Sequence, residues 1–354
     1  MNTTITLNEF ANLIQQVGAD VTVLGMGEPG SGKSAMLKLI ASNLPHMKTA
    51  YVDCALLDLG DLQMPRVTED VFSFVPNSLF VSDRPVLLML DEIGKAMRPV
   101  QNALLPLMLE HRIGNYKLPE GSIVFATTNL SSDGVGDSVQ AHARNRMCVV
   151  HIQKPDAGFD DEGNITSDGW AHWAVENDID PALLAWVKSE PSCLASYTDA
   201  GQVDNPYIFN PKKQQVAFVS PRSLEKASHI LKKRMYMTPD ALIAALSGTV
   251  GESAARNMQA FLTIADALPE WARIMKSPDT CPVPENPIAQ QMLAMTALSR
   301  LTKENVTPWL TYMERLMVEI QAMFASGVMR GSKRGLVVTN KLFTKFCIDK
   351  NFLF

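Results

Sequence analysis

The chain has 354 residues, of which 46% are hydrophobic and 19% are charged, and its formal net charge is -5. This length allows two or three domains of ~100–200 residues each, and the composition is that of a globular protein with a sizeable core. The acidic balance argues against a dedicated nucleic-acid-binding domain, which usually carries a strong basic excess, although it does not exclude a local basic stripe.

The cysteines and the first residues predict the compartment. None of the five cysteines belongs to a CxxC pair, which favours buried thiols in a reducing environment over a disulfide framework. The first ten residues, MNTTITLNEF, lack the charged and apolar regions of a signal peptide. No apolar run is long enough to cross a bilayer. We therefore expect a soluble cytoplasmic protein that has no membrane contact.

The first part of the chain alternates strand and helix patterns. Residues 8–17 predict a short amphipathic helix, with Phe10, Leu13 and Ile14 on one face. Five apolar runs predict strands; they begin at Val21, near Val52, and at Val86, Ser122 and Met147. Helical patterns lie between these runs. The alternation predicts an α/β fold with a doubly wound, parallel, five-stranded sheet covered on both faces.

The pattern changes after His151. Residues 156–169 are polar, acidic and glycine-containing, and they predict a loop or linker. The clearest patterns beyond it are helical, in the segments WAHWAVEN, PALLAWVKSE, PRSLEKASHILKKRM and PDALIAALSG, with a last helical region from Ile288 to about Phe324. We therefore predict an α/β domain over residues 1–153, a linker and helical lid over 154–236, and a helical C-terminal extension over 237–354.

A phosphate-binding motif follows the first predicted strand of the sheet. The segment matches GxxxxGK[ST] and consists of Gly27, Glu28, Pro29, Gly30, Ser31, Gly32, Lys33 and Ser34. Glycines let the backbone N–H groups wrap around phosphate oxygens, and the following helix presents its positive end to the same group. Lys33 should reach the β- and γ-phosphates, and Ser34 should ligate Mg²⁺.

Two further strands end in polar side chains. Asp91 and Glu92 follow the apolar run VLLML, at the sheet edge where parallel α/β proteins place their chemistry. Asp91 can hold the Mg²⁺ ion, and Glu92 can act as general base toward an attacking water. Asn129 follows the strand IVFATT and could orient that water. An ordinary solvated strand end and a turn asparagine remain the alternatives.

Three arginines could contact a transferring phosphoryl group. Arg144 and Arg146 precede the last predicted strand, and Arg222 opens the helix of PRSLEKA. The guanidinium group offers delocalised charge and a fixed fork of donors, which suit such a phosphoryl group. Each could instead be an ordinary surface arginine.

Together these motifs resemble the MoxR-type branch of the AAA+ ATPases, which is similar to midasin. The stretch RPVLLMLDEIGKAMRPVQNALLPLMLEHRIGNYKLPEGSIVFATTNL carries the resemblance most clearly. ARNRM is similar to the arginine-finger sequence of the family, and SPRS is similar to its second sensor motif. The resemblance covers about residues 15–235 and fades beyond them.

The resemblance implies an ATP-hydrolysing, Mg²⁺-dependent ring, with a hexamer as the expected assembly, that remodels a protein client. Arg146 would reach the nucleotide of a neighbouring subunit, Arg144 is the less favoured finger, and Arg222 would sense the γ-phosphate. The loop DLGDLQMPRV, which includes residues 58–65, would face the central pore. A partner with a von Willebrand A domain is also implied.

Two residues depart from the family pattern. Met147 replaces an aromatic residue after the finger. Pro106 interrupts a predicted helix and should kink it, because proline has no backbone N–H.

Two other functions remain open at the level of the sequence. The first is a DNA-acting AAA+ motor, such as a helicase loader or a restriction-type translocase, which a basic pore loop would favour. The loop DLGDLQMPRV instead carries one arginine against two aspartates. The second is a nucleotide-gated scaffold with little turnover, against which the intact Glu92 argues.

Overall fold

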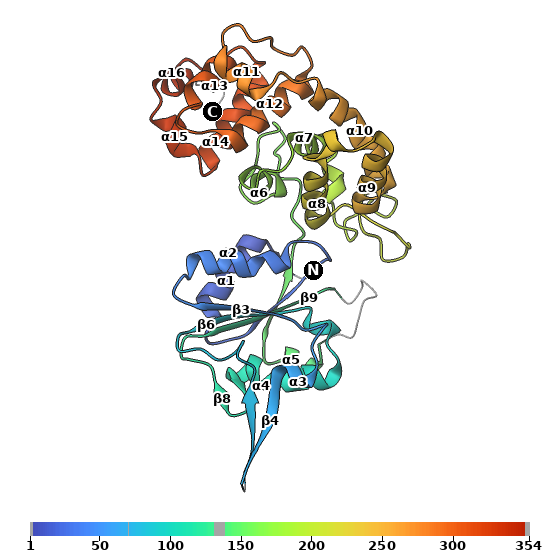
Figure 1. The fold of residues 1–354 in the computed structure, drawn as a ribbon, viewed down its shortest axis with the longest axis vertical. Coiled ribbons are helices and arrows are strands. Elements are labelled where there is room, and N and C mark those ends of the chain that lie inside the picture. Colours follow the sequence, from blue (N-terminus) through green and yellow to red (C-terminus); the bar gives the residue numbers. More distant parts are fainter. Residues whose placement is uncertain (1–2, 70, 131–138, 351–354) are drawn as a thin grey trace. The chain divides into compact units, whose positions relative to one another are not determined.

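A computed structural model describes residues 3–69, 71–130 and 139–350 of the chain. It divides into two compact units, Met1–Lys154 and Pro155–Phe354 (Figure 1). The first unit is α/β and the second is helical. Each unit has its own hydrophobic core.

A parallel sheet forms the centre of the first unit. Its strands lie in the order β1-β10-β2-β9-β6-β3. Their bounds are β1 (Thr4–Ile5), β2 (Val23–Met26), β3 (Lys48–Asp53), β6 (Val86–Asp91), β9 (Ile123–Thr128) and β10 (Cys148–Ile152). The doubly wound parallel sheet is therefore confirmed, but it has six strands where the sequence predicts five. The added strand, β1, is two residues long and pairs with β10 at the sheet edge.

The strand register brings several polar residues to one edge of the sheet. β6 and β9 are buried along their whole length, as their continuous apolar runs predict. Asp53 lies opposite Asp91, and Met26 lies opposite Thr128. The carboxyl ends of β2, β3, β6 and β9 consequently meet at one edge.

Helices cover both faces of the sheet (Figure 1). On one face lie α1 (Leu7–Val17) and α2 (Met36–Asn43); on the other lie α3 (Leu59–Leu62), α4 (Arg98–Glu110) and α5 (Ala141–Arg144). The pleat of β6 divides its side chains between two clusters. Leu87 and Met89 pack in the cluster of α1 and α2, whereas Leu88 and Leu90 pack in that of α4. α4 remains one helix through Pro106.

Two antiparallel hairpins extend from this α/β unit. One joins β4 (Gln63–Thr68) to β5 (Val71–Pro76), and the other joins β7 (Arg112–Ile113) to β8 (Tyr116–Lys117). Residues 58–65 are predicted from the sequence to be a loop. They instead contain the short helix α3 and the first residues of β4, so this segment leads directly into a hairpin.

The second unit consists of helices around one core that extends from Ala157 to Phe346. The helices are α6 (Trp170–Glu176), α7 (Pro181–Ser189), α8 (Pro221–Leu231), α9 (Pro239–Val250), α10 (Glu252–Asp266), α11 (Trp271–Lys276), α12 (Pro287–Arg300), α13 (Val306–Met313), α14 (Val318–Arg330), α15 (Arg334–Val338) and α16 (Lys341–Asp349). The four clearest predicted helices correspond to α6, α7, α8 and α9. The predicted division of this part at residue 236 stays a prediction.

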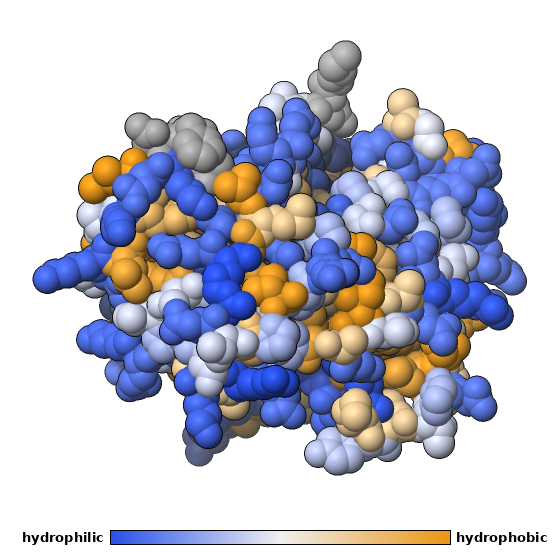
Figure 2. All heavy atoms as spheres, turned by 90° about the horizontal axis from the view of Figure 1, so that it is seen from above, coloured by the Kyte–Doolittle hydropathy of each residue, from blue (hydrophilic) through white to orange (hydrophobic). Residues whose placement is uncertain are grey.

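The described residues contain no helix that is both long and apolar enough to span a bilayer. Figure 2 shows one face of the molecule, on which hydrophilic side chains surround small apolar areas.

Candidate functional site

The phosphate-binding loop connects β2 to a short 3₁₀ helix, η1 (Lys33–Ala35), and then to α2. Gly30 and Gly32 have φ values of 74° and 103°, a region that favours glycine. Gly27 is favoured for a different reason, because a Cβ atom there would make a tight contact of 3.1 Å with the carbonyl oxygen of Ile152. The motif glycines thus permit a tight turn beside β10.

Lys33 lies within this loop and is only 5% exposed. Its Nζ atom donates hydrogen bonds to the carbonyl oxygens of Gly27 at 2.8 Å and Glu28 at 2.7 Å, and to Oδ1 of Asn129 at 3.0 Å. The structure therefore brings together two of the predicted site elements, the loop lysine and the asparagine after β9. Phosphate oxygens offer the same ammonium group stronger, charged acceptors.

Asp91 is the last residue of β6 and is 3% exposed. Its Oδ2 atom accepts hydrogen bonds from Ser34 Oγ at 2.7 Å and from the Tyr51 hydroxyl at 3.0 Å. Its Oδ1 atom accepts from Thr127 Oγ1 and from the backbone N–H of Glu92. A hydroxyl and a carboxylate are hard oxygen donors of the kind that Mg²⁺ prefers, so Ser34 and Asp91 fit a magnesium ion.

Glu92 directly follows β6 and has a φ of 55°, which is uncommon for a residue other than glycine. Its Oε1 atom accepts a hydrogen bond from Asn129 Nδ2 at 3.2 Å and forms an ion pair with Lys95 Nζ at 3.2 Å. Its Oε2 atom is buried and has no hydrogen-bond partner among the described residues. Lys33, Asn129, Glu92 and Lys95 thus form one continuous polar chain.

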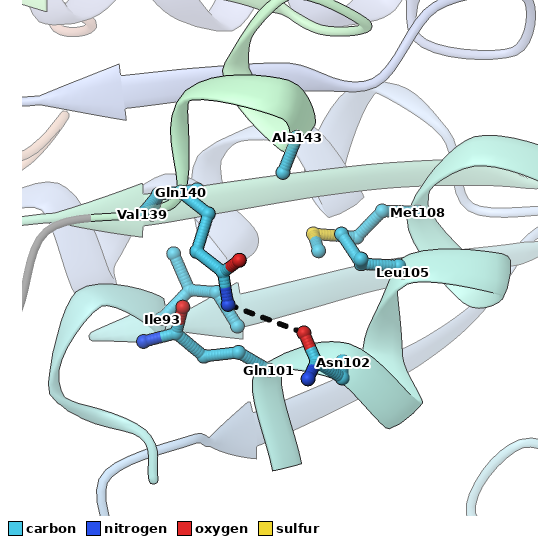
Figure 3. Close-up of a pocket in the computed structure, with 8 residues that line it drawn as sticks. All are labelled: Ile93, Gln101, Asn102, Leu105, Met108, Val139, Gln140 and Ala143. Atoms are coloured by element: carbon cyan, nitrogen blue, oxygen red, sulfur yellow. Dashed lines mark hydrogen bonds between the residues drawn. The ribbon is translucent and has the colours of Figure 1, made fainter. Parts of the chain in front are cut away.

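The predicted finger arginines lie at the surface. Arg144 ends α5, Arg146 follows two residues later, and both side chains are exposed. Figure 3 shows how the start of this segment contacts α4: Gln140 Nε2 donates to Asn102 Oδ1 at 3.2 Å, beside the buried Val139 and Ala143. This contact connects the segment that carries Arg144 and Arg146 to α4, the helix that comes after Glu92 in the chain.

Arg222 lies in the second unit, in the first turn of α8. The N-terminus of α8 is capped by Ser220, whose Oγ accepts from the backbone N–H of Ser223. The structure does not place Arg222 relative to the phosphate-binding loop, so its role as a sensor stays a prediction.

Several residues of the site carry no motif signal. Tyr51 and Thr127 hold Asp91, and only the register of β3, β6 and β9 reveals their position. A buried pair, Lys154 and Glu28, lies beside the loop with Nζ and Oε2 3.9 Å apart. Thr127 is a polar residue one position before the end of an apolar strand. That pattern is the sequence signal for a side chain that donates a hydrogen bond to Asp91.

Cys54 lies next to the same edge and is fully buried. Burial raises the pKa of its thiol far above the usual range, and the charges of Asp53, Asp91 and Glu92 raise it further. Its backbone N–H donates to the Asp91 carbonyl at 2.9 Å. Cys54 therefore acts as a small apolar residue in the core.

Comparison with known families gives a match over this part of the chain. Residues 23–153 match the model of the ATPase family associated with various cellular activities (AAA). The chain carries an AAA ATPase domain. The match begins at β2, ends after β10, and includes the phosphate-binding loop, Asp91, Glu92 and Asn129. The domain binds nucleotide and is an ATPase, which converts ATP and water to ADP and phosphate.

Three solved structures are similar to the chain at low sequence identity. NtrX from Brucella abortus, in complex with ADP, is 14% identical with a TM-score of 0.40, covering 97% of this chain and 69% of NtrX. A putative ATPase from Cytophaga hutchinsonii is 14% identical with a TM-score of 0.32, covering 72% of this chain and 88% of the other.

A third similar structure is RuvB, the Holliday junction branch migration motor of Thermotoga maritima. It is 14% identical with a TM-score of 0.36, covering 85% of this chain and 86% of RuvB. No curated protein matches the chain.

Replacing Lys33 with alanine should abolish ATP binding by the AAA ATPase domain, because the loop loses the buried ammonium group that should bind the phosphates. Equilibrium titration with a fluorescent ATP analogue measures this affinity. Lys38→Ala is the matched control, since Lys38 is an exposed lysine on α2, the helix that follows the loop. An unchanged affinity in Lys33→Ala would contradict the assignment of the loop.

Proposed function

We propose that the chain is an AAA+ ring ATPase of MoxR type that uses ATP hydrolysis to remodel a protein partner. The observation that supports a protein partner is an exposed apolar stripe on the β4–β5 hairpin. The chemistry rests on the polar side chains at the carboxyl edge of the sheet.

In this proposal Glu92 is the general base and Asn129 orients the attacking water. The water oxygen attacks the γ-phosphorus while Glu92 takes its proton, and the bond from phosphorus to the bridging oxygen of ADP breaks. Lys33 binds the β- and γ-phosphates, and the backbone N–H groups of residues 27–34 surround them. Ser34 and Asp91 would hold Mg²⁺, which neutralises phosphate charge when it is bound.

Hydrolysis also needs positive charge from outside the subunit. Arg146 is exposed after α5, where a neighbouring subunit can receive it, and it is the proposed arginine finger. Arg144 is the less favoured candidate, and Arg222 is the proposed γ-phosphate sensor. The resemblance to MoxR-type proteins supports a ring, with a hexamer as the expected form, and a partner with a von Willebrand A domain.

The β4–β5 hairpin is the proposed contact for the client. Its register pairs Pro65 with Phe74 and Val67 with Phe72, so these four side chains share one face. Val67 is 75% exposed and Phe72 is 58% exposed, and the rings of Phe72 and Phe74 form a T-shaped pair with centroids 5.0 Å apart. We call this set of four residues the hairpin stripe. An exposed apolar surface of this kind marks an interaction site.

The charges of the hairpin favour a protein over a nucleic acid. Within the described hairpin residues, 63–69 and 71–76, the charged side chains are Arg66 and Glu69, one of each sign. Nucleic-acid binding draws its affinity from an excess of Lys and Arg. An apolar stripe without that excess instead suits the exposed hydrophobic side chains of a polypeptide.

A set of contacts runs from the ATP site to this hairpin. α4 begins shortly after Glu92 and leads at its end into the β7–β8 hairpin. Gly114, in the β7–β8 turn, lies so close to the base of the other hairpin that a Cβ atom would be 2.3 Å from Gln63 Oε1 and 3.3 Å from Phe74 Cβ. A movement of α4 could therefore reach the hairpin stripe.

Replacing Phe72 with serine should weaken binding of unfolded casein by about tenfold, which corresponds to ~1.4 kcal/mol of binding energy. The measurement is fluorescence anisotropy of labelled casein in the presence of a non-hydrolysable ATP analogue. Leu56→Ser is the control, because Leu56 is 82% exposed but lies outside the hairpin. Equal binding by the wild type and Phe72→Ser, or tight binding of a single-stranded oligonucleotide in place of casein, would contradict a protein client.

Replacing Arg146 with alanine should leave ATP binding intact and remove most hydrolysis, since arginine fingers contribute ~10³–10⁵ in rate. Mixing Arg146→Ala with Lys33→Ala should restore partial activity, because one interface then pairs an intact finger with an intact loop. Arg144→Ala is the control and should be milder. Full activity of Arg146→Ala, or a specific activity that is constant down to the monomer concentration, would contradict a finger that acts between subunits.

A further inference from the structure

Glu92 is held by two donors that both contact the same oxygen. Asn129 Nδ2 and Lys95 Nζ each lie 3.2 Å from Oε1, while Oε2 is buried without a hydrogen-bond partner in the described part of the chain. Two donors on one oxygen fix the direction in which the Glu92 carboxylate points. A carboxylate that takes a proton from an attacking water must be held in one position.

The two donors differ in how they respond to nucleotide. Asn129 also accepts a hydrogen bond from Lys33, whose ammonium group contacts the loop carbonyls of Gly27 and Glu28. Phosphate oxygens would draw Lys33 toward themselves, so the partners of Asn129 change when ATP binds. The contact between Asn129 and Glu92 is therefore not a constant restraint.

Lys95 is independent of the nucleotide. It lies three residues after Glu92 in the short 3₁₀ helix η2 (Ile93–Lys95), and its backbone N–H donates to the Glu92 carbonyl at 2.9 Å. The ion pair between Lys95 and Glu92 therefore forms within a single helical turn. Both side chains are partly exposed, at 29% for Lys95 and 23% for Glu92. Ion pairs at such sites contribute little to stability, which points to a role in orientation.

We propose that Lys95 is a positioning residue for ATP hydrolysis: it holds Oε1 of Glu92 and so keeps the carboxylate in place to accept the proton of the attacking water. Lys95 itself touches neither the water nor the nucleotide. The φ of 55° at Glu92 turns the chain sharply at the end of β6 and brings Lys95 back onto the carboxylate. This inference rests on the proposed function of Glu92 as the base.

The first test separates binding from turnover. Lys95→Met should lower kcat by about tenfold, a part of the ~10²–10⁴-fold that a positioned acid or base contributes. The Kd for a fluorescent ATP analogue should stay within about twofold of the wild type, since Lys33 and the loop make the phosphate contacts. Lys95→Arg should restore most of kcat, because arginine also donates to a carboxylate. Lys117→Met, an exposed lysine of β8, is the control.

A double-mutant cycle tests the route through Glu92. In a Glu92→Gln background, which removes the base, Lys95→Met should lower the residual rate no further. An additive effect would show that Lys95 acts elsewhere. A faster Lys95→Met enzyme, or equal losses of affinity and kcat, would also overturn the proposal. If Glu92→Gln itself turns over normally, the proposed base fails first, so the two failures are distinguishable.

Discussion

The buried carboxyl group of Asp91 is the interaction on which the site depends. It accepts hydrogen bonds from the phosphate-binding loop through Ser34, from β3 through Tyr51, from β9 through Thr127, and from the backbone of Glu92. Burying such a group without partners would be costly, so these donors must stay in place when the domain folds. One side chain thereby fixes the relative positions of three strands and the loop.

Most of the α/β fold could be predicted from sequence because its central strands are buried on both faces. The runs VLLMLD and IVFATT became β6 and β9, in which every residue is buried. Their polar ends, Asp91, Glu92 and Asn129, then follow from the rule that parallel strands gather their chemistry at one edge. The phosphate-binding loop could be predicted because its glycines are required by positive φ and close backbone approach.

What the sequence did not reveal depends on contacts between distant segments. β1 has two residues, which are too few to show the alternating hydrophobic pattern of a strand. It is a strand only because it pairs with β10. The β4–β5 hairpin could not be predicted from the apolar pattern. Its apolar stripe is exposed, so these residues do not pack into the core. The roles of Tyr51 and Lys95 require knowledge of strand register and of the turn after β6. A single motif search detects none of these.

The proposed hydrolysis depends most directly on Glu92 acting as the base. The most direct measurement is single-turnover hydrolysis of ATP by Glu92→Gln at saturating protein, alongside the equilibrium affinity for ATP. We predict that affinity is retained while the rate of the chemical step falls by ~10²–10⁴, because an amide cannot accept the proton of the water. A Glu92→Gln protein that hydrolyses ATP at the wild-type rate would contradict the account.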